Sequence, residues 1–148
     1  MPTLLLINGP NLSRLGQRSP DIYGTTTLAD VEARVRAIAG GHGWSVEACQ
    51  SNHEGALVDF LERWRESANA LVINPGALMM NGWVLRDALE DFPAPWIEVH
   101  ISNVWARETF RHSSVLSAIA GGVIAGLGVN CYTMAARELI EHHQEYAP

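Results

Sequence analysis

The feature that most constrains the fold is a regular alternation between short, almost continuously apolar runs and longer segments with helical periodicity. Apolar runs of this kind are typical of strands buried on both faces, which requires a parallel sheet covered by helices on each side. With five such runs, the pattern predicts a flavodoxin-like, doubly wound α/β fold that spans residues 1–148 as a single domain. The predicted strands are Thr3–Asn8, Ser45–Gln50, Ala70–Asn74, Trp96–His100 and Val123–Gly126.

The segments between these runs carry the apolar stripes of amphipathic helices. After the first run, Leu28, Val31 and Val35 recur at helical spacing. Thr27 and Asp30 stand three residues apart at the start of this stripe, where they form the pattern of a capping box. Further helices are predicted over residues 57–64, 83–91 and 131–143.

The charged residues exclude several classes of chemistry. All ten basic residues are arginine, so Schiff-base catalysis, pyridoxal phosphate chemistry and a P-loop lysine are excluded. The formal net charge is −6 without a basic run, which argues against a nucleic-acid partner. An anionic substrate must therefore be bound by arginines, amides or backbone N–H groups. Arg107 and Arg111 are four residues apart, which on a helix places them on one face as an anion site or as a solvated surface pair.

The apolar content gives no sign of a membrane segment or a secretion signal. No run approaches the roughly 18 apolar residues of a membrane span, and the first residues lack a basic n-region. Cys49 and Cys131 form no CxxC pair and are expected to be reduced thiols. We therefore expect a cytoplasmic protein with no membrane contact.

Polar residues follow the predicted strands, at the edge where open α/β sheets bind their ligands. Asn11 follows the first strand, Asn74 ends the third, and His100 ends the fourth. Amides, hydroxyls and a histidine gather at this edge, whereas clustered carboxylates that would bind a metal do not. The sequence thus predicts a site without a metal.

Two pairs of residues are candidates for acid–base chemistry. Glu98 and His100 lie two apart on one face of a strand, where a carboxylate can orient an imidazole. Arg18 and Tyr23 lie in a long polar loop, residues 15–24, of a kind that often serves as a lid. A tyrosine is a poor base at neutral pH unless a neighbouring guanidinium stabilises its phenolate. The alternatives are a packing role for Tyr23 and a structural role for His100.

Several segments in order carry a resemblance to a known enzyme family. They are Leu4–Leu12 with Tyr23-Gly24, Gln50–Gly55, Val72–Ala77, Leu85–Ala88 and Ile97–Asn103. Together they resemble the type II 3-dehydroquinate dehydratases over nearly the whole chain. The resemblance implies a lyase that removes water from 3-dehydroquinate by anti elimination through an enolate, giving 3-dehydroshikimate without a cofactor. It also implies the shikimate pathway of aromatic amino acid biosynthesis, or quinate catabolism.

The resemblance implies a role for each candidate in the reaction. Tyr23 would remove the proton from C2, with Arg18 keeping the phenol ionised. His100, oriented by Glu98, would protonate the departing C1 hydroxyl. Asn11 would help to stabilise the enolate through a bound water.

Substrate binding would extend to a neighbouring subunit. By resemblance, the chain would assemble into trimers and these into a dodecamer, and Asp87 would reach the site of the adjacent subunit. Arg107 would support the lid region. Within one subunit, the cyclic hydroxy acid would be contacted by Asn74, Arg111 and the backbone N–H groups of Ile101 and Ser102.

The chain departs from the family where ring hydroxyls would be recognised. Met79–Gly82 replaces the usual Thr-His-Thr-Ser. Met80 stands at the histidine position and cannot make that hydrogen bond. Two alternatives therefore stay open beside the dehydratase: the same acid–base set acting on a less hydroxylated ring acid, and a binding or scaffold homologue without catalysis.

Overall fold

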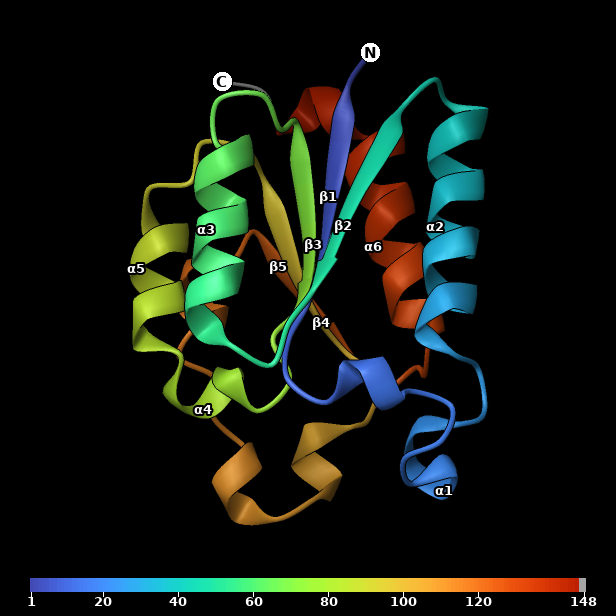
Figure 1. The fold of residues 1–148 in the computed structure, drawn as a ribbon, viewed down its shortest axis with the longest axis vertical. Coiled ribbons are helices and arrows are strands. Elements are labelled where there is room, and N and C mark those ends of the chain that lie inside the picture. The colour runs from blue at the N-terminus through green and yellow to red at the C-terminus, as the bar shows by residue number, and fades with distance from the viewer. Residues whose placement is uncertain (147–148) are drawn as a thin grey trace.

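The strands of this computed structural model, which describes residues 1–146, form one parallel sheet in the order β2-β1-β3-β4-β5 (Figure 1). This arrangement confirms the predicted flavodoxin-like fold. Four strands have the predicted bounds, and the fifth begins and ends one residue earlier than predicted. The strands are β1 (Thr3–Asn8), β2 (Ser45–Gln50), β3 (Ala70–Asn74), β4 (Trp96–His100) and β5 (Gly122–Ala125).

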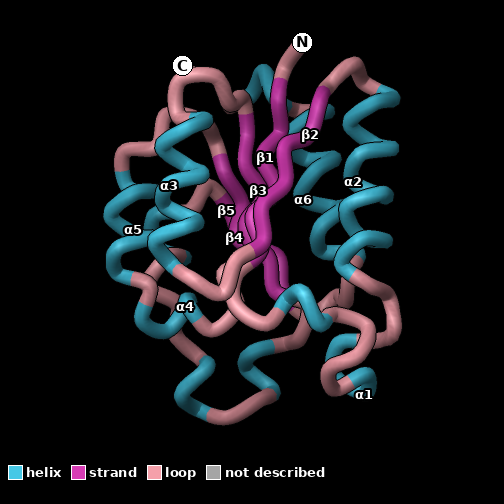
Figure 2. Tube along the Cα trace, viewed as in Figure 1, coloured by secondary structure: helices cyan, strands magenta, loops and turns pink. Residues whose placement is uncertain are grey.

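Helices cover both faces of the sheet (Figures 1 and 2). On one face lie α2 (Leu28–Gly41) and α6 (Asn130–Glu141), and on the other lie α3 (Glu54–Trp64) and α5 (Trp83–Glu90). Two short helices, α1 (Pro20–Tyr23) and α4 (Leu78–Asn81), lie beyond the carboxyl ends of the strands. No helix within residues 1–146 combines the length and the apolar character needed to cross a membrane.

Alternation along β1 explains why its sequence is continuously apolar. Leu4 and Leu6 pack into the core under α2 and α6, whereas Leu5 and Ile7 pack into the core under α3 and α5. Because both faces of a central parallel strand are covered, side chains that point to either face are buried. The two cores fix the sheet, and with it the positions at which the strands end.

The start of α2 has the predicted capping box. The hydroxyl of Thr27 accepts a hydrogen bond from the backbone N–H of Asp30, and the Asp30 carboxylate accepts one from the backbone N–H of Thr27, each at 3.1 Å. These contacts satisfy two N–H groups that a helix start otherwise leaves without partners. The helix therefore begins at the residue after Thr27, as the sequence indicates.

The connection between β4 and β5, residues 101–121, differs from the prediction. It consists of turns and three short 3₁₀ helices, η2 (Val104–Ala106), η3 (Thr109–Arg111) and η4 (Ser117–Ile119). The expectation that Arg107 and Arg111 share a helix face is wrong, because Arg107 directly follows η2 and Arg111 lies in η3. Each turn closes within three residues, so the two arginines are directed independently.

The loops after β1 and β3 approach each other at backbone distance. The N–H of Gly9 donates to the carbonyl oxygen of Asn74 at 2.8 Å. A Cβ on Gly9 would lie 2.3 Å from the carbonyl oxygen of Pro75. Gly76, with a φ of 58°, faces Pro10 across the same contact. A residue with a side chain at Gly9 would force the loops apart.

We expect Gly9→Ala to lower the free energy of unfolding by about 1–3 kcal/mol, the usual cost of an added carbon in a well-packed region. Urea denaturation measures this difference. The matched control is Gly40→Ala, since Gly40 is exposed in α2 with open space at its Cβ position. Alanine there should be neutral or stabilising by about 0.5–1 kcal/mol. Equal stability of the two variants would show that the loop contact imposes no constraint.

Candidate active site

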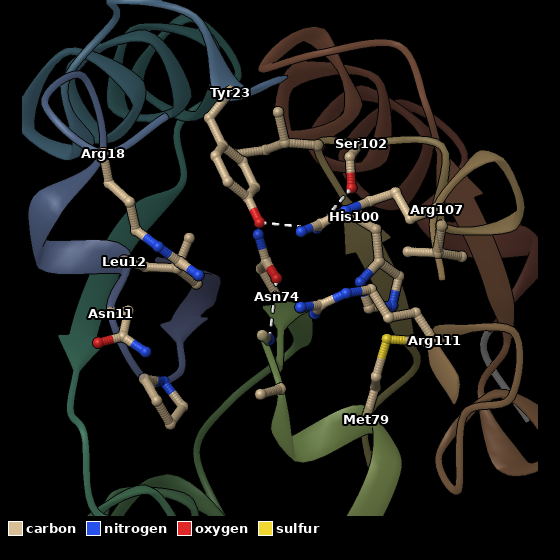
Figure 3. Close-up of a pocket in the computed structure, with 15 residues that line it drawn as sticks. Asn11, Leu12, Arg18, Tyr23, Asn74, Met79, His100, Ser102, Arg107 and Arg111 are labelled. Atoms are coloured by element: carbon tan, nitrogen blue, oxygen red, sulfur yellow. Dashed lines mark hydrogen bonds between the residues drawn. The ribbon is translucent and has the colours of Figure 1, made fainter. Parts of the chain in front are cut away.

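A cleft lies beyond the carboxyl ends of the central strands (Figure 3). It takes residues from the loops after β1 and β3, from α1, and from the β4–β5 connection. All the predicted site residues line it except Glu98, Met80 and Asp87. The lining residues are Pro10, Asn11, Leu12, Arg18, Tyr23, Asn74, Gly76, Ala77, Met79, His100, Ile101, Ser102, Val104, Arg107 and Arg111.

Three predicted residues lie outside the cleft wall for different reasons. Glu98 is completely buried behind His100. Asp87 is exposed on α5 and is not part of its own chain's cleft. Met80 is half-buried outside the lining, and its neighbour Met79 lines the cleft instead. Successive residues of a helix point about 100° apart, so α4 presents only one of its two methionines to the cleft.

Two arginines flank Tyr23 (Figure 3). Nη1 of Arg107 donates to the Tyr23 hydroxyl oxygen at 2.7 Å. The guanidinium carbons of Arg18 and Arg107 lie 5.3 and 5.5 Å from the centre of the tyrosine ring. The sequence marked Arg18 as the partner of the phenol, and the structure adds Arg107 at the oxygen itself. Negative charge on this oxygen is stabilised by a direct charged donor.

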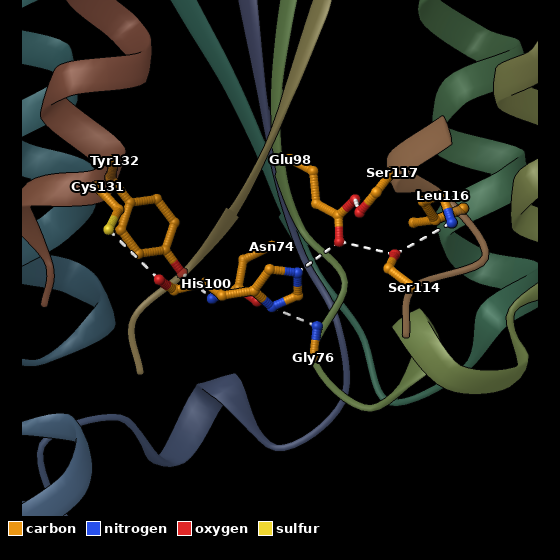
Figure 4. Close-up of polar contacts among 9 residues, drawn as sticks. All are labelled: Asn74, Gly76, Glu98, His100, Ser114, Leu116, Ser117, Cys131 and Tyr132. Carbon is orange, nitrogen blue, oxygen red and sulfur yellow. Dashed lines mark hydrogen bonds and ion pairs between the residues drawn. The ribbon is translucent and has the colours of Figure 1, made fainter. Parts of the chain in front are cut away.

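His100 ends β4 with one ring nitrogen bound to a carboxylate (Figure 4). Its Nε2 lies 2.5 Å from Oε2 of Glu98, which is 0% exposed. Burial raises the pKa of the Glu98 carboxyl, but hydrogen bonds from His100, Ser117 and Ser114 outweigh it and hold the pKa below its usual value. The charged carboxylate accepts the Nε2 proton, so Nδ1 is the ring nitrogen available to the cleft.

Two serines that the sequence analysis did not single out complete this arrangement. The hydroxyl of Ser114 donates to Oε2 of Glu98 at 2.8 Å, and the hydroxyl of Ser117 donates to Oε1 at 2.7 Å. Both belong to the β4–β5 connection. In the sequence they stand out only by their spacing, because Ser114 lies three residues after Arg111 and Ser117 three residues after Ser114. Such a spacing is ordinary for a polar loop.

Tyr132 on α6 is a second residue that the sequence did not reveal. Its hydroxyl accepts from Nδ2 of Asn74 at 2.8 Å and donates to Oδ1 of Asn8 at 2.6 Å. Oδ1 of Asn74 in turn accepts the N–H of Gly76 at 3.1 Å. Burial raises the pKa of the Tyr132 phenol, so its hydroxyl stays protonated. The Asn74 amide is thereby fixed, with its second Nδ2 proton left for the cleft.

The loop that carries Asn11 is supported by residues at and just beyond the end of β2. Asn11 has a φ of 69°, a left-handed conformation that asparagine tolerates better than most residues. Its backbone N–H donates to Oδ1 of Asn52 at 2.9 Å. Nε2 of Gln50 donates to Asn52 and to the carbonyl oxygen of Gly9, at 3.3 and 3.2 Å. Gln50 and Asn52 thus support the site without lining it.

The charge of the cleft favours an anionic ligand. Arg18, Arg107 and Arg111 line it, and none of the described lining residues is a carboxylate. Nε of Arg111 is bound to the exposed Glu108 at 2.7 Å. No group of three or more His, Cys, Asp or Glu side chains within residues 1–146 is arranged to hold a metal ion. The arrangement offers a base with cationic support, an imidazole backed by a carboxylate, and donors for an anion.

Known proteins match the chain over nearly its whole length. Residues 2–140 match the family model described as Dehydroquinase class II. The chain is 51% identical over 142 residues to Catabolic 3-dehydroquinase 2 of Aspergillus flavus, covering 96% of this chain and 95% of that protein. It is 51% identical over 137 residues to a 3-dehydroquinate dehydratase of Cereibacter sphaeroides, covering 93% of each. The crystal structure of a type II dehydroquinase from Propionibacterium acnes has a TM-score of 0.91 and 43% identity, covering 95% of this chain and 97% of that one.

We expect Tyr132→Phe to lower the free energy of unfolding by about 1–3 kcal/mol, because it leaves buried amide groups of Asn8 and Asn74 without their partner. Thermal or urea unfolding measures the loss. The control is Tyr146→Phe, which removes a hydroxyl that donates to Glu138 at 2.8 Å near the surface. Its cost should be smaller because water can replace the lost contact. A smaller loss for Tyr132→Phe than for the control would contradict the role of this hydroxyl.

Proposed function

We propose that this chain, which belongs to the class II dehydroquinase family and is a hydro-lyase, acts on 3-dehydroquinate and that Tyr23 and His100 divide the elimination between them. Tyr23, as the phenolate, removes the proton from C2, and the electron pair passes into an enolate. His100 then donates its Nδ1 proton to the C1 hydroxyl, the C1–O bond breaks, and water leaves. The enolate returns to the ketone as the new C1–C2 double bond forms.

This proposal rests on one observation: of two groups that line the same cleft, Tyr23 has a cationic partner and His100 has an anionic one. Arg107 donates to the oxygen of Tyr23 at 2.7 Å, and a cationic donor stabilises the phenolate that a base requires. Glu98 accepts from His100 at 2.5 Å, and a carboxylate stabilises the imidazolium that an acid requires. General acid–base catalysis needs one group that is stabilised in its deprotonated form and another that is stabilised in its protonated form.

The remaining lining residues suit a cyclic hydroxy acid. The substrate carboxylate is proposed to bind the free Nδ2 proton of Asn74 and the backbone N–H groups of Ile101 and Ser102. Arg111 would contact the ring hydroxyls, and Asn11 would hold a water against the enolate oxygen. All five residues line the same cleft, and its excess of arginine favours a carboxylate over a neutral ring.

We propose further that the site is completed by a second subunit. Asp87 lies on α5 outside its own cleft, and beside it Trp83 and Val84 are 60% and 58% exposed. Large apolar side chains grouped on a surface often mark a subunit contact. A homo-oligomer built from trimers, with the dodecamer as its full form, would bring Asp87 to a neighbouring site.

The proposed location of this single-domain chain is the cytoplasm.

We expect Tyr23→Phe to lower kcat on 3-dehydroquinate by about 10²–10⁴-fold, the contribution typical of a positioned base. His100→Ala should lower kcat as well, because the leaving hydroxyl loses its proton donor. Ultraviolet absorption of the conjugated product measures both rates. Tyr146→Phe is the control, since that hydroxyl lies outside the cleft. Turnover by Tyr23→Phe at the wild-type rate would eliminate Tyr23 as the base.

The apolar wall made by Met79 favours a second candidate, the same acid–base set acting on a less hydroxylated ring. Met79 is 5% exposed and lines the cleft, where it offers no hydrogen bond to a ring hydroxyl. Met80, at the position of the family's histidine, is half-buried outside the lining. The two candidates therefore differ in how the enzyme treats a substrate with one hydroxyl fewer.

We expect 3-dehydroquinate to be the better substrate and Met79→Thr, which places a hydroxyl on the cleft wall, to raise its kcat/KM, by up to about 5- to 150-fold if one buried hydrogen bond of about 1–3 kcal/mol is restored. Met79→Leu is the control, because it keeps the wall apolar. Kinetics with 3-dehydroquinate and a ring-deoxy analogue would be compared for all variants. A wild-type preference for the deoxy analogue, reversed in Met79→Thr, would support the second candidate instead.

A further inference from the structure

The buried carboxylate of Glu98 is bound by side chains from two separate segments (Figure 4). Oε2 accepts from His100, its neighbour on β4, and from Ser114, while Oε1 accepts from Ser117. A carboxylate with no access to water is costly unless protein donors satisfy its oxygens. Two of the three donors here are hydroxyls of the β4–β5 connection, so the charge of Glu98 depends on that connection.

The hydroxyl of Ser114 is directed by the backbone around it. The N–H of Leu116 donates to Oγ of Ser114 at 3.1 Å, which occupies the oxygen as an acceptor and leaves its proton for the carboxylate. Val115, between them, donates its N–H to the carbonyl oxygen of Met79 at 2.7 Å and accepts from Nη1 of Arg86 at 2.6 Å. The serine is thus fixed by contacts with α4 and α5 on either side.

The hydroxyl of Ser117 has a simpler environment. It starts η4, and within residues 1–146 its hydroxyl has Oε1 of Glu98 as its one hydrogen-bond partner, at 2.7 Å. Removal of this hydroxyl therefore takes one hydrogen bond from the Glu98 carboxylate and breaks no other side-chain hydrogen bond among the described residues. Ser113, in the same connection, is exposed and its hydroxyl makes no hydrogen bond among the described residues, which makes it a matched control.

We propose that Ser114 and Ser117 are positioning residues for the acid: they hold Glu98 as an anion, aimed at Nε2 of His100, so that Nδ1 carries the proton for the leaving hydroxyl. This inference rests on the proposed function, in which His100 is the acid. Neither serine lines the cleft, so both act through Glu98. Without the hydroxyls, burial favours the neutral carboxyl, which takes the Nε2 proton. His100 is then neutral and no longer an acid at Nδ1.

Two isotope effects separate this role from a general structural one. Deuterium at C2 of the substrate slows the step of the base, whereas D₂O slows protonation of the leaving hydroxyl. We expect Ser117→Ala to lower kcat about 10- to 100-fold, a part of the roughly 10²–10⁴-fold that a positioned acid supplies. The solvent isotope effect on kcat should grow and the C2 isotope effect should shrink, because the acid step becomes rate-limiting. Ser117→Thr keeps a hydroxyl and should recover both effects.

The controls distinguish failure of this inference from failure of the proposed function. Ser113→Ala should keep the wild-type kcat and both isotope effects. If His100→Ala shifts the isotope effects and Ser117→Ala and Ser114→Ala do not, the serine inference is overturned and His100 remains the acid. If His100→Ala leaves them unshifted, both are overturned. Isotope effects are ratios measured on active enzyme, so a variant that is only partly folded still gives a decisive result.

Discussion

The charge of the buried Glu98 is the constraint on which the rest of the site depends. β4 lies between β3 and β5, and Glu98 is 0% exposed within it, so its charge must be satisfied by protein donors rather than water. That requirement draws the β4–β5 connection back against the sheet. The same connection supplies Arg107 to the phenol of Tyr23 and Arg111 to the cleft. One buried charge therefore fixes the proposed acid His100, the arginine that donates to the proposed base Tyr23, and a second arginine of the cleft.

A second network fixes the opposite wall of the cleft without any charge. The hydroxyl of Tyr132 joins Asn8 at the end of β1 to Asn74 at the end of β3, and the glycine contact between the following loops sets their separation. Because these strands end at the same edge, a small displacement of either strand would move the cleft residues that follow it. The rigid sheet and its two polar networks position side chains that come from loops, which suits a reaction needing a base and an acid on fixed opposite sides.

The sequence predicts the features that depend on local pattern and misses those that depend on distant contacts. Continuous apolar runs locate the strands because burial on both faces leaves little choice of residue. The spacing of Arg107 and Arg111 suggested a helix, but each arginine is directed by its own contact and the turns close early. Met79 and Met80 are neighbours on a four-residue helix and point in different directions, and the sequence does not show which of them faces the cleft. The partner of Tyr132 at Asn8 is 124 residues away, and no local pattern marks such a contact.

The protonation of the two His100 ring nitrogens shows whether Glu98 is the anion that holds His100 as the acid. Nitrogen NMR of protein carrying ¹⁵N-labelled histidine, assigned by comparison with the His100→Ala variant, reports which ring nitrogen holds a proton. We expect a proton on Nε2 in a strong hydrogen bond to Glu98, with Nδ1 as the nitrogen that gives its proton to the leaving hydroxyl. A ring that carries its proton on Nδ1 while Nε2 stays bare would contradict it, because Glu98 would then not be the anion that holds His100 as the acid.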